Sequence, residues 1–217
     1  MNDVLPRWAL VLATMGAGAL LMGAIPPLIE GMAPGVPLMW WVGRTAGLVA
    51  YLALWLAMMF GVLIGSRGGG GWLNNGVVFE LHKAWSLIAV LATGVHVLAL
   101  VADAHSGVPV LASVVPLVSP RLTAAVTLGT FAGWGLIGVV VATLVKARLP
   151  TWVWRAVHAG SFGAFLLALM HSVLAGTDTV TAEVRLMYAG TGTVLLAVVL
   201  HRLALASLNR VETRRAG

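Results

Sequence analysis

Residues 81–100 read LHKAWSLIAVLATGVHVLAL, an apolar run that carries two histidines, His82 and His96. The run is part of a longer apolar segment at 77–101, which is long enough to cross roughly 30 Å of hydrocarbon as a single helix. Ionisable side chains are rare inside membranes, where they face the interior of a helix bundle and mark functional sites. This stretch therefore predicts a transmembrane helix and a site built on two imidazoles.

The composition is that of an integral membrane protein. Of the 217 residues, 60% are hydrophobic and only 9% are charged, and the mean hydropathy is +0.98, values outside the range of soluble domains. The net charge is +6, but the basic residues are spread singly along the chain, which argues against nucleic acid as a partner. The lack of cysteine excludes disulfides, iron–sulfur clusters, thiolate-bound zinc and c-type haem. Histidine is therefore the main candidate ligand for any metal or cofactor.

We expect an all-α integral membrane fold, a six-transmembrane-helix bundle that forms one domain over residues 1–217. The first apolar segment is too long for the core of a secretory signal and lacks an A-x-A site, which favours a membrane helix. The stretch 108–118 is interrupted by Pro109 and Pro116 and is too short to span, so we expect an interfacial or re-entrant loop. The six spans are expected near 8–25, 39–65, 77–101, 121–145, 151–175 and 185–207.

The distribution of lysine and arginine predicts the orientation. These residues concentrate on the cytoplasmic side of membrane proteins, and ten of the 13 lie on one side of the expected spans. Both termini are therefore expected in the cytoplasm, and Trp152 and Trp154 then fit an aromatic belt at the inner interface. The ten are Arg7, Arg67, Lys83, Lys146, Arg148, Arg155, Arg202, Arg210, Arg214 and Arg215, and the other three are Arg44, Arg121 and Arg185.

Two expected spans, the third and the fifth, carry two histidines each. His82 and His96 are fourteen positions apart in 77–101, and His158 and His171 are thirteen positions apart in 151–175. The two spans run in the same direction, and the intervals correspond to about 21 and 20 Å along a helix. His82 is thus level with His158, and His96 with His171. Two imidazoles facing each other at one depth ligate a haem iron from both sides, so the pattern favours two stacked haems over four separate core histidines.

The rotation of the second histidine helix does not bring both of its histidines to one face. At 100° per residue, fourteen positions return to within about 40° of the starting face, whereas thirteen positions leave a mismatch of about 140°. We therefore expect the helix at 151–175 either to bend or rewind between its histidines, where Gly160 and Gly163 lie, or to present its two ligands around different flanks.

Residues 38–175 resemble the ferric-reductase-like transmembrane family, which includes the membrane domains of ferric reductases and NADPH oxidases. The resemblance implies a six-helix fold with bis-histidine b-type haems, in which His82 and His158 ligate the inner haem and His96 and His171 the outer one. The single-domain bacterial members, such as the haem-binding subunit of the methionine sulfoxide reductase system, are the closest in layout and imply a bacterial cytoplasmic membrane. The stretches that carry the resemblance are GRTAGLVAYLAL (43–54), LHKAWSLIAVLATGVH (81–96) and WRAVHAGSFGAFLLALMH (154–171).

The chain departs from the ferric reductases and NADPH oxidases after its last span. Those proteins usually continue into flavin and NADPH domains, whereas this chain ends ten residues after Ser207 and has no G-x-G-x-x-G fingerprint that follows a strand. We therefore expect an oxidoreductase component that receives electrons from a separate flavoprotein or quinol, so that flavin or NAD(P)H enters only through a partner. The outer acceptor stays open among a ferric chelate, dioxygen, quinone or a protein.

Three basic residues are candidates for contact with haem propionates. Arg44 is expected at the outer haem, where the alternative is that its side chain reaches the membrane interface. Lys83 and Arg155 are expected at the inner haem, although both also fit the ordinary excess of cytoplasmic positive charge. The sequence assigns no role to His105 or His201.

Two alternative functions remain. One is a single-haem, quinol-linked electron-transfer subunit in which only one histidine pair is occupied. The other is a transporter without redox activity that uses the histidines as a proton relay, although carboxylates are missing from the middles of the expected spans.

Overall fold

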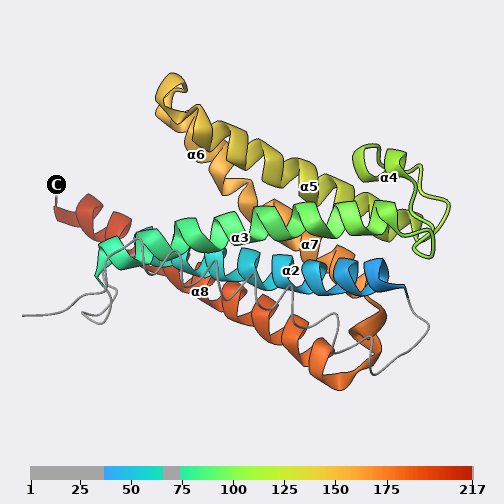
Figure 1. Ribbon diagram of the computed structural model, residues 1–217. Coiled ribbons are helices and arrows are strands. Elements are labelled where there is room, and N and C mark those ends of the chain that lie inside the picture. The colour runs from blue at the N-terminus through green and yellow to red at the C-terminus, as the bar shows by residue number, and fades with distance from the viewer. Residues whose placement is uncertain (1–36, 66–73, 217) are drawn as a thin grey trace, which may run out of the picture.

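The computed structural model describes residues 37–65 and 74–216, with the side chains of α8 described as far as Ala204. Helices and short connections account for this part of the chain, and no strand occurs within it (Figure 1). The expected span at 8–25 lies outside the described residues. The elements are α2 (Leu38–Gly65), α3 (Asn75–Ala102), α4 (Val110–Val114), α5 (Thr123–Leu144), η1 (Lys146–Arg148), α6 (Thr151–Ala159), α7 (Ser161–Ala175), η2 (Thr177–Val180) and α8 (Ala182–Ala216).

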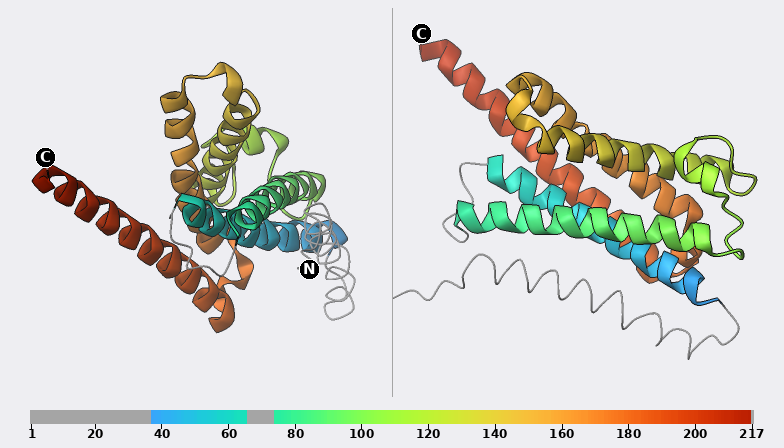
Figure 2. Two further views of the ribbon diagram at one scale, coloured as in Figure 1. Left: turned by 90° about the vertical axis from the view of Figure 1, so that its left-hand side faces the viewer. Right: turned by 45° about the horizontal axis from the view of Figure 1, so that its top comes forward.

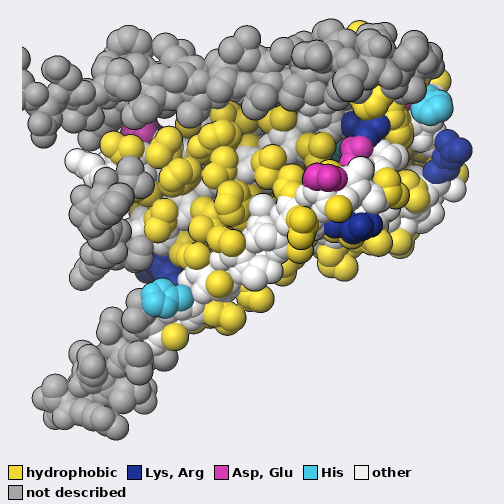
Figure 3. All heavy atoms as spheres, turned by 90° about the horizontal axis from the view of Figure 1, so that it is seen from below, with side chains coloured by type: hydrophobic (Ala, Val, Ile, Leu, Met, Phe, Trp, Pro, Cys, Tyr) yellow, Lys and Arg dark blue, Asp and Glu magenta, His cyan; other side chains and the backbone are white. Residues whose placement is uncertain are grey.

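Five stretches of helix are long and apolar enough to cross a membrane, which identifies a membrane protein. They begin and end within a few residues of the last five expected spans. Large apolar side chains point outward along them; Leu98 and Leu144, for example, are 70% and 79% exposed. In Figure 3 the described surface is hydrophobic in its middle, and charged and histidine side chains lie toward its two ends. The stretches are Leu38–Ile64, Asn75–Ala102, Thr123–Leu144, Thr151–Ala175 and Ala182–Ala204.

The helices form two closely packed pairs. α2 lies along α3, and α5 lies along α7, while α2 also contacts α7 and α8 (Figures 1 and 2). α8 crosses the bundle obliquely, as both views of Figure 2 show. α2 and α5 run in one direction, and α3 and the α6–α7 segment run in the other, as the colours of Figure 1 show and the sequence predicts. The extensive contacts of α3 are with α2, so α3 and α6–α7 belong to different pairs.

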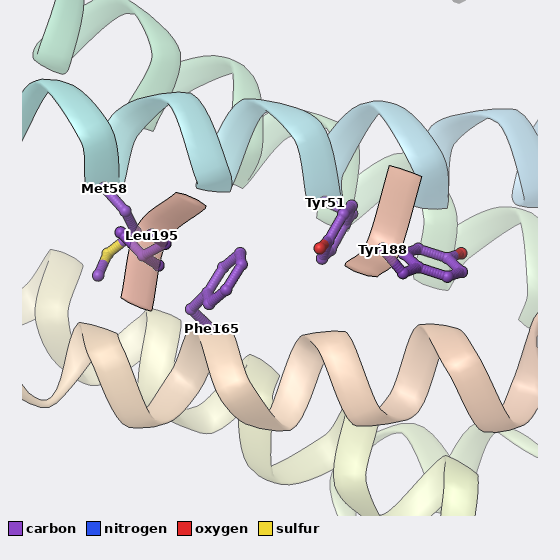
Figure 4. Close-up of a cluster of buried hydrophobic side chains, with 5 residues drawn as sticks. All are labelled: Tyr51, Met58, Phe165, Tyr188 and Leu195. Atoms are coloured by element: carbon purple, nitrogen blue, oxygen red, sulfur yellow. The ribbon is translucent and has the colours of Figure 1, made fainter. Parts of the chain in front are cut away.

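A cluster of buried side chains joins α2, α7 and α8. Tyr51 stacks on Phe165 with ring centroids 5.6 Å apart and meets Tyr188 edge-on at 5.2 Å, as Figure 4 shows together with Met58 and Leu195. The Tyr51 hydroxyl is 2.5 Å from Oγ1 of Thr191, which satisfies the phenol inside the cluster. The second phenol of the cluster, that of Tyr188, is hydrogen-bonded to Ser172. The other side chains of the cluster are apolar, and together they fix α7 against α2.

The segment around α4 is a short re-entrant element that docks on α5. Thr130 Oγ1 donates to the carbonyl of Ala112 at 2.8 Å, and Trp134 Nε1 donates to the carbonyl of Val114 at 3.0 Å. Trp134 lies about 16 Å along α5 from its first residue, so α4 folds back toward the membrane. Backbone groups at that depth must be satisfied by protein. The prediction for 108–118 is therefore refined to a re-entrant helix held by polar side chains of α5.

Replacing Thr130 by valine is expected to loosen this element. The substitution leaves the carbonyl of Ala112 without its donor, at a cost of about 1–3 kcal/mol. Cleavage by added protease within residues 103–122 of the purified protein should accelerate by about fivefold or more. Thr143→Val is the matched control, because Thr143 donates only to Val139 of its own helix. Equal cleavage rates in the two variants would contradict the assignment.

Candidate functional site

The four histidines of the two expected pairs lie together as the spacing predicts. The rings of His82 and His158, here the inner pair, have centroids 6.0 Å apart and planes inclined by 67°. The rings of His96 and His171, here the outer pair, have centroids 6.1 Å apart and planes inclined by 77°. Each pair joins α3 to the α6–α7 segment, so the two pairs bridge the two halves of the bundle at two depths.

Three of these imidazoles make the same kind of hydrogen bond, from Nδ1 to a backbone carbonyl of a neighbouring helix. Nδ1 of His82 lies 2.8 Å from the carbonyl oxygen of Ala57, and Nδ1 of His96 lies 2.7 Å from that of Gly43. On the other side of the bundle, Nδ1 of His171 lies 2.8 Å from the carbonyl oxygen of Ala125. Since a carbonyl only accepts hydrogen bonds, each of these rings carries its proton on Nδ1. Nε2 is then left with a lone pair.

A glycine stands four positions after each of these three carbonyls. A Cβ on Gly47 would lie 2.8 Å from Nδ1 of His96, and one on Gly129 would lie 2.7 Å from Nδ1 of His171. A Cβ on Gly61 would lie 3.3 Å from Cε1 of His82. At Gly47 and Gly129 a side chain would thus displace the histidine ring from the carbonyl one turn earlier, and at Gly61 it would crowd the ring. The sequence contains these glycines, but their role becomes visible only once the helices are paired.

The expected distortion of the second histidine helix is present at Gly160. α6 ends at Ala159 and α7 begins at Ser161, and Gly160 has a ψ of −18° where a regular helix has about −42°. A Cβ on Gly160 would lie 2.9 Å from the carbonyl oxygen of Val157, which explains the glycine. The interruption allows His158 and His171 to face the same neighbour, α3, despite their spacing of thirteen positions.

His158 is held differently from the other three histidines. Its Nδ1 is buried and has no hydrogen-bond partner among the described residues. The ring instead stacks on Trp154, with centroids 5.0 Å apart and planes inclined by 23°. Nζ of Lys146 lies 4.4 Å from the centroid of the Trp154 ring. The inner pair therefore combines one ring fixed by a carbonyl with one ring fixed by an indole.

The basic residues expected near propionates have different surroundings. The Arg44 guanidinium forms an ion pair with Asp178 of η2, with Nε 3.2 Å from Oδ2, and also lies over the Trp41 ring. Lys83 pairs with Glu80 at 2.7 Å on the surface of α3. Arg155 is exposed on α6. The sequence does not single out Asp178, because a carboxylate in a loop so distant from Arg44 along the chain gives no local signal.

The two remaining histidines lie apart from the pairs. His105 follows α3, where its ring meets Trp40 edge-on at 5.4 Å and its backbone N–H donates to Asp103. His201 is exposed near the end of the described side chains of α8. Neither residue joins the inner or the outer pair.

The arrangement fits a ligand that needs one imidazole on each of two opposite sides. Two metal–nitrogen bonds of about 2 Å, together with the radii of two imidazole rings, put their centroids about 6.3 Å apart, close to the separations of both pairs. The described residues contain no cluster of three or more His, Cys, Asp or Glu side chains suited to a bare metal ion. A cofactor that brings its own equatorial ligands, such as haem, requires only the two imidazoles present in each pair.

Residues 38–178 match the model of a domain of unknown function, DUF8596. The match covers well over half of the 217 residues, so the chain belongs to this family. It runs from the start of α2 to Asp178 and includes both histidine pairs, the three glycines and both partners of the Arg44–Asp178 ion pair. No curated protein and no solved structure matches the chain.

Replacing Gly129 by alanine is expected to displace the ring of His171. The added methyl would lie 2.7 Å from Nδ1, so the hydrogen bond to Ala125 must lengthen or break. Nitrogen-15 spectra of the labelled imidazoles should show loss of the fixed Nδ1–H form at His171 alone. Gly133→Ala is the control, because a Cβ there meets no atom within 4 Å. An unchanged His171 signal in Gly129→Ala would refute the role given to the glycine.

Proposed function

We propose that this member of the family carries electrons across the membrane by means of two b-type haems. In this proposal His82 and His158 hold one haem, and His96 and His171 hold the other. The observation that carries it is the repeated geometry of the two pairs, with ring centroids 6.0 and 6.1 Å apart between the same two helical segments. A single pair would also suit a local hydrogen-bonding role, whereas two pairs in register across the bundle form a path.

The donor atoms in the pairs suit haem iron. A carbonyl acceptor on Nδ1 fixes the tautomer of the imidazole, orients the ring and increases the basicity of Nε2. His82, His96 and His171 have this arrangement, so each presents Nε2 away from the helix that holds Nδ1. Haem b, when bound, supplies a reversible one-electron centre, and two histidine ligands favour electron transfer over substrate binding at the iron.

The rest of the chain provides spacing and insulation. The intervals of fourteen and thirteen positions separate the two levels by about 20 Å, which places one level in each half of the membrane. Between the two levels, the buried cluster around Tyr51 packs α7 against α2 through apolar side chains. Lys83 and Arg155 are the proposed basic groups for propionates at the inner pair. Arg44 is the corresponding group at the outer pair, where it shares its charge with Asp178.

The resemblance to the ferric-reductase-like transmembrane family supports the same function. It implies electron flow from a cytoplasmic or membrane donor, either a flavoprotein or a quinol, through the inner pair and then the outer pair. The acceptor on the outer side is a ferric chelate, dioxygen, a quinone or a partner protein. In this proposal the positive-inside orientation puts both termini in the cytoplasm of a bacterial cell.

Alanine substitution of single ligands is expected to remove one haem at a time. His82→Ala and His96→Ala should each reduce bound haem from about two per chain to about one, because an iron with one protein ligand is held far less tightly. The measurement is a pyridine haemochrome assay on protein produced with ample haem and normalised to protein concentration.

His105→Ala and His201→Ala serve as controls, since neither ring joins a pair. Both variants should keep the full haem content of the wild type. Loss of haem in the controls, or full retention in both ligand variants, would show that the pairs do not bind haem. Wild-type protein with one haem, lost in only one of the two ligand variants, would identify the single-haem form.

A further inference from the structure

The two histidine pairs differ in how firmly their rings are oriented. In the outer pair, both Nδ1 atoms are bonded to helix carbonyls, at 2.7 and 2.8 Å. In the inner pair, only His82 has such a bond, while Nδ1 of His158 is buried without a partner among the described residues. We infer that Trp154 is the positioning residue of His158, and that the inner site consequently holds its haem less tightly than the outer site. This inference rests on the proposed function.

Trp154 replaces the missing carbonyl with a different kind of contact. It lies four positions before His158 on α6, so the two rings share one face of the helix and stack at 5.0 Å. Lys146 also contacts the indole ring, at 4.4 Å from its centroid. Stacking restrains the plane of the imidazole but leaves rotation within that plane free, whereas a hydrogen bond at Nδ1 fixes the direction of Nε2. His158 is thus the least constrained of the four rings.

The consequence is an order of affinity between the two sites. Removing the hydrogen-bond acceptor of a metal-bound histidine typically lowers metal affinity about 10- to 100-fold. Two histidines of the outer site have such an acceptor and only one of the inner site has it, so haem should leave the inner site first. The stack on Trp154 limits this difference, and a ring pair of this kind contributes about a two- to tenfold factor.

Haem release from the purified, fully loaded protein to excess apomyoglobin tests the inference. Wild-type protein should release haem in two phases of equal amplitude, with the fast rate several-fold to about fiftyfold higher than the slow one. The single-haem variants assign the phases: His96→Ala keeps the inner haem and should follow the fast phase, and His82→Ala keeps the outer haem and should follow the slow phase. Equal rates, or the opposite assignment, would overturn the order.

Substitution of the tryptophan tests the positioning role. Trp154→Leu should accelerate the fast phase alone by about two- to tenfold and shift the low-spin electron paramagnetic resonance signal of that centre, because the ring plane of His158 is released. Trp154→Phe keeps a stacking ring and should restore both properties. Trp152→Leu is the matched control, since Trp152 is on the same helix but 73% exposed, and it should change neither phase.

The two kinds of failure are distinguishable. An effect of Trp154→Leu on both phases, on neither phase, or equally in Trp152→Leu would refute Trp154 as the positioning residue of His158. Wild-type protein that takes up no haem would instead refute the proposed function itself. The two results are read from different quantities, the release rates in the first case and the haem content in the second.

Discussion

The hydrogen bonding of imidazole rings inside a membrane bundle is the main constraint on this structure. In three of four cases Nδ1 reaches a backbone carbonyl of a neighbouring helix. That carbonyl is already part of a helix, and the next turn leaves room for the ring because it has no side chain at Gly47, Gly61 and Gly129. A polar group buried in hydrocarbon without such a partner is costly. These hydrogen bonds therefore favour one register of α3 on α2 and one of α7 on α5.

The register repeats along the bundle. The two α2 carbonyls that accept from His82 and His96 belong to Ala57 and Gly43, which have the same spacing along α2 as the two histidines have along α3. α2 and α3 thus match each other at two levels through one antiparallel register, and the aromatic cluster around Tyr51 ties α7 to the same α2. In the other helix pair, the segment that carries His158 and His171 is interrupted at Gly160, between α6 and α7. The fourth histidine, beside that interruption, is the one that stacks on an indole.

The sequence predicts well what depends on distance along one helix. Hydropathy locates the last five spans, and the intervals of fourteen and thirteen positions predict which histidines share a depth. The second interval also predicts either a distortion between its histidines, near Gly160 and Gly163, or ligands on different flanks of the helix. The sequence pattern does not predict contacts between side chains of different helices. Nothing in the sequence pattern indicates the ion pair between Arg44 and Asp178. From the sequence Trp154 is assigned to an interfacial aromatic belt, and only the structure shows its ring stacked on His158. Such contacts depend on lateral packing, which periodicity does not encode.

The central claim is that each chain places two iron centres between two pairs of histidines. Quantified haem on the purified wild-type protein, combined with its reduced-minus-oxidised absorption spectrum, tests this most directly. The account predicts about two haems per chain, both with the low-spin spectrum of two imidazole ligands and both reducible by dithionite. Colourless protein recovered from cells with ample haem supply, or haem with a high-spin, five-coordinate spectrum, would contradict it.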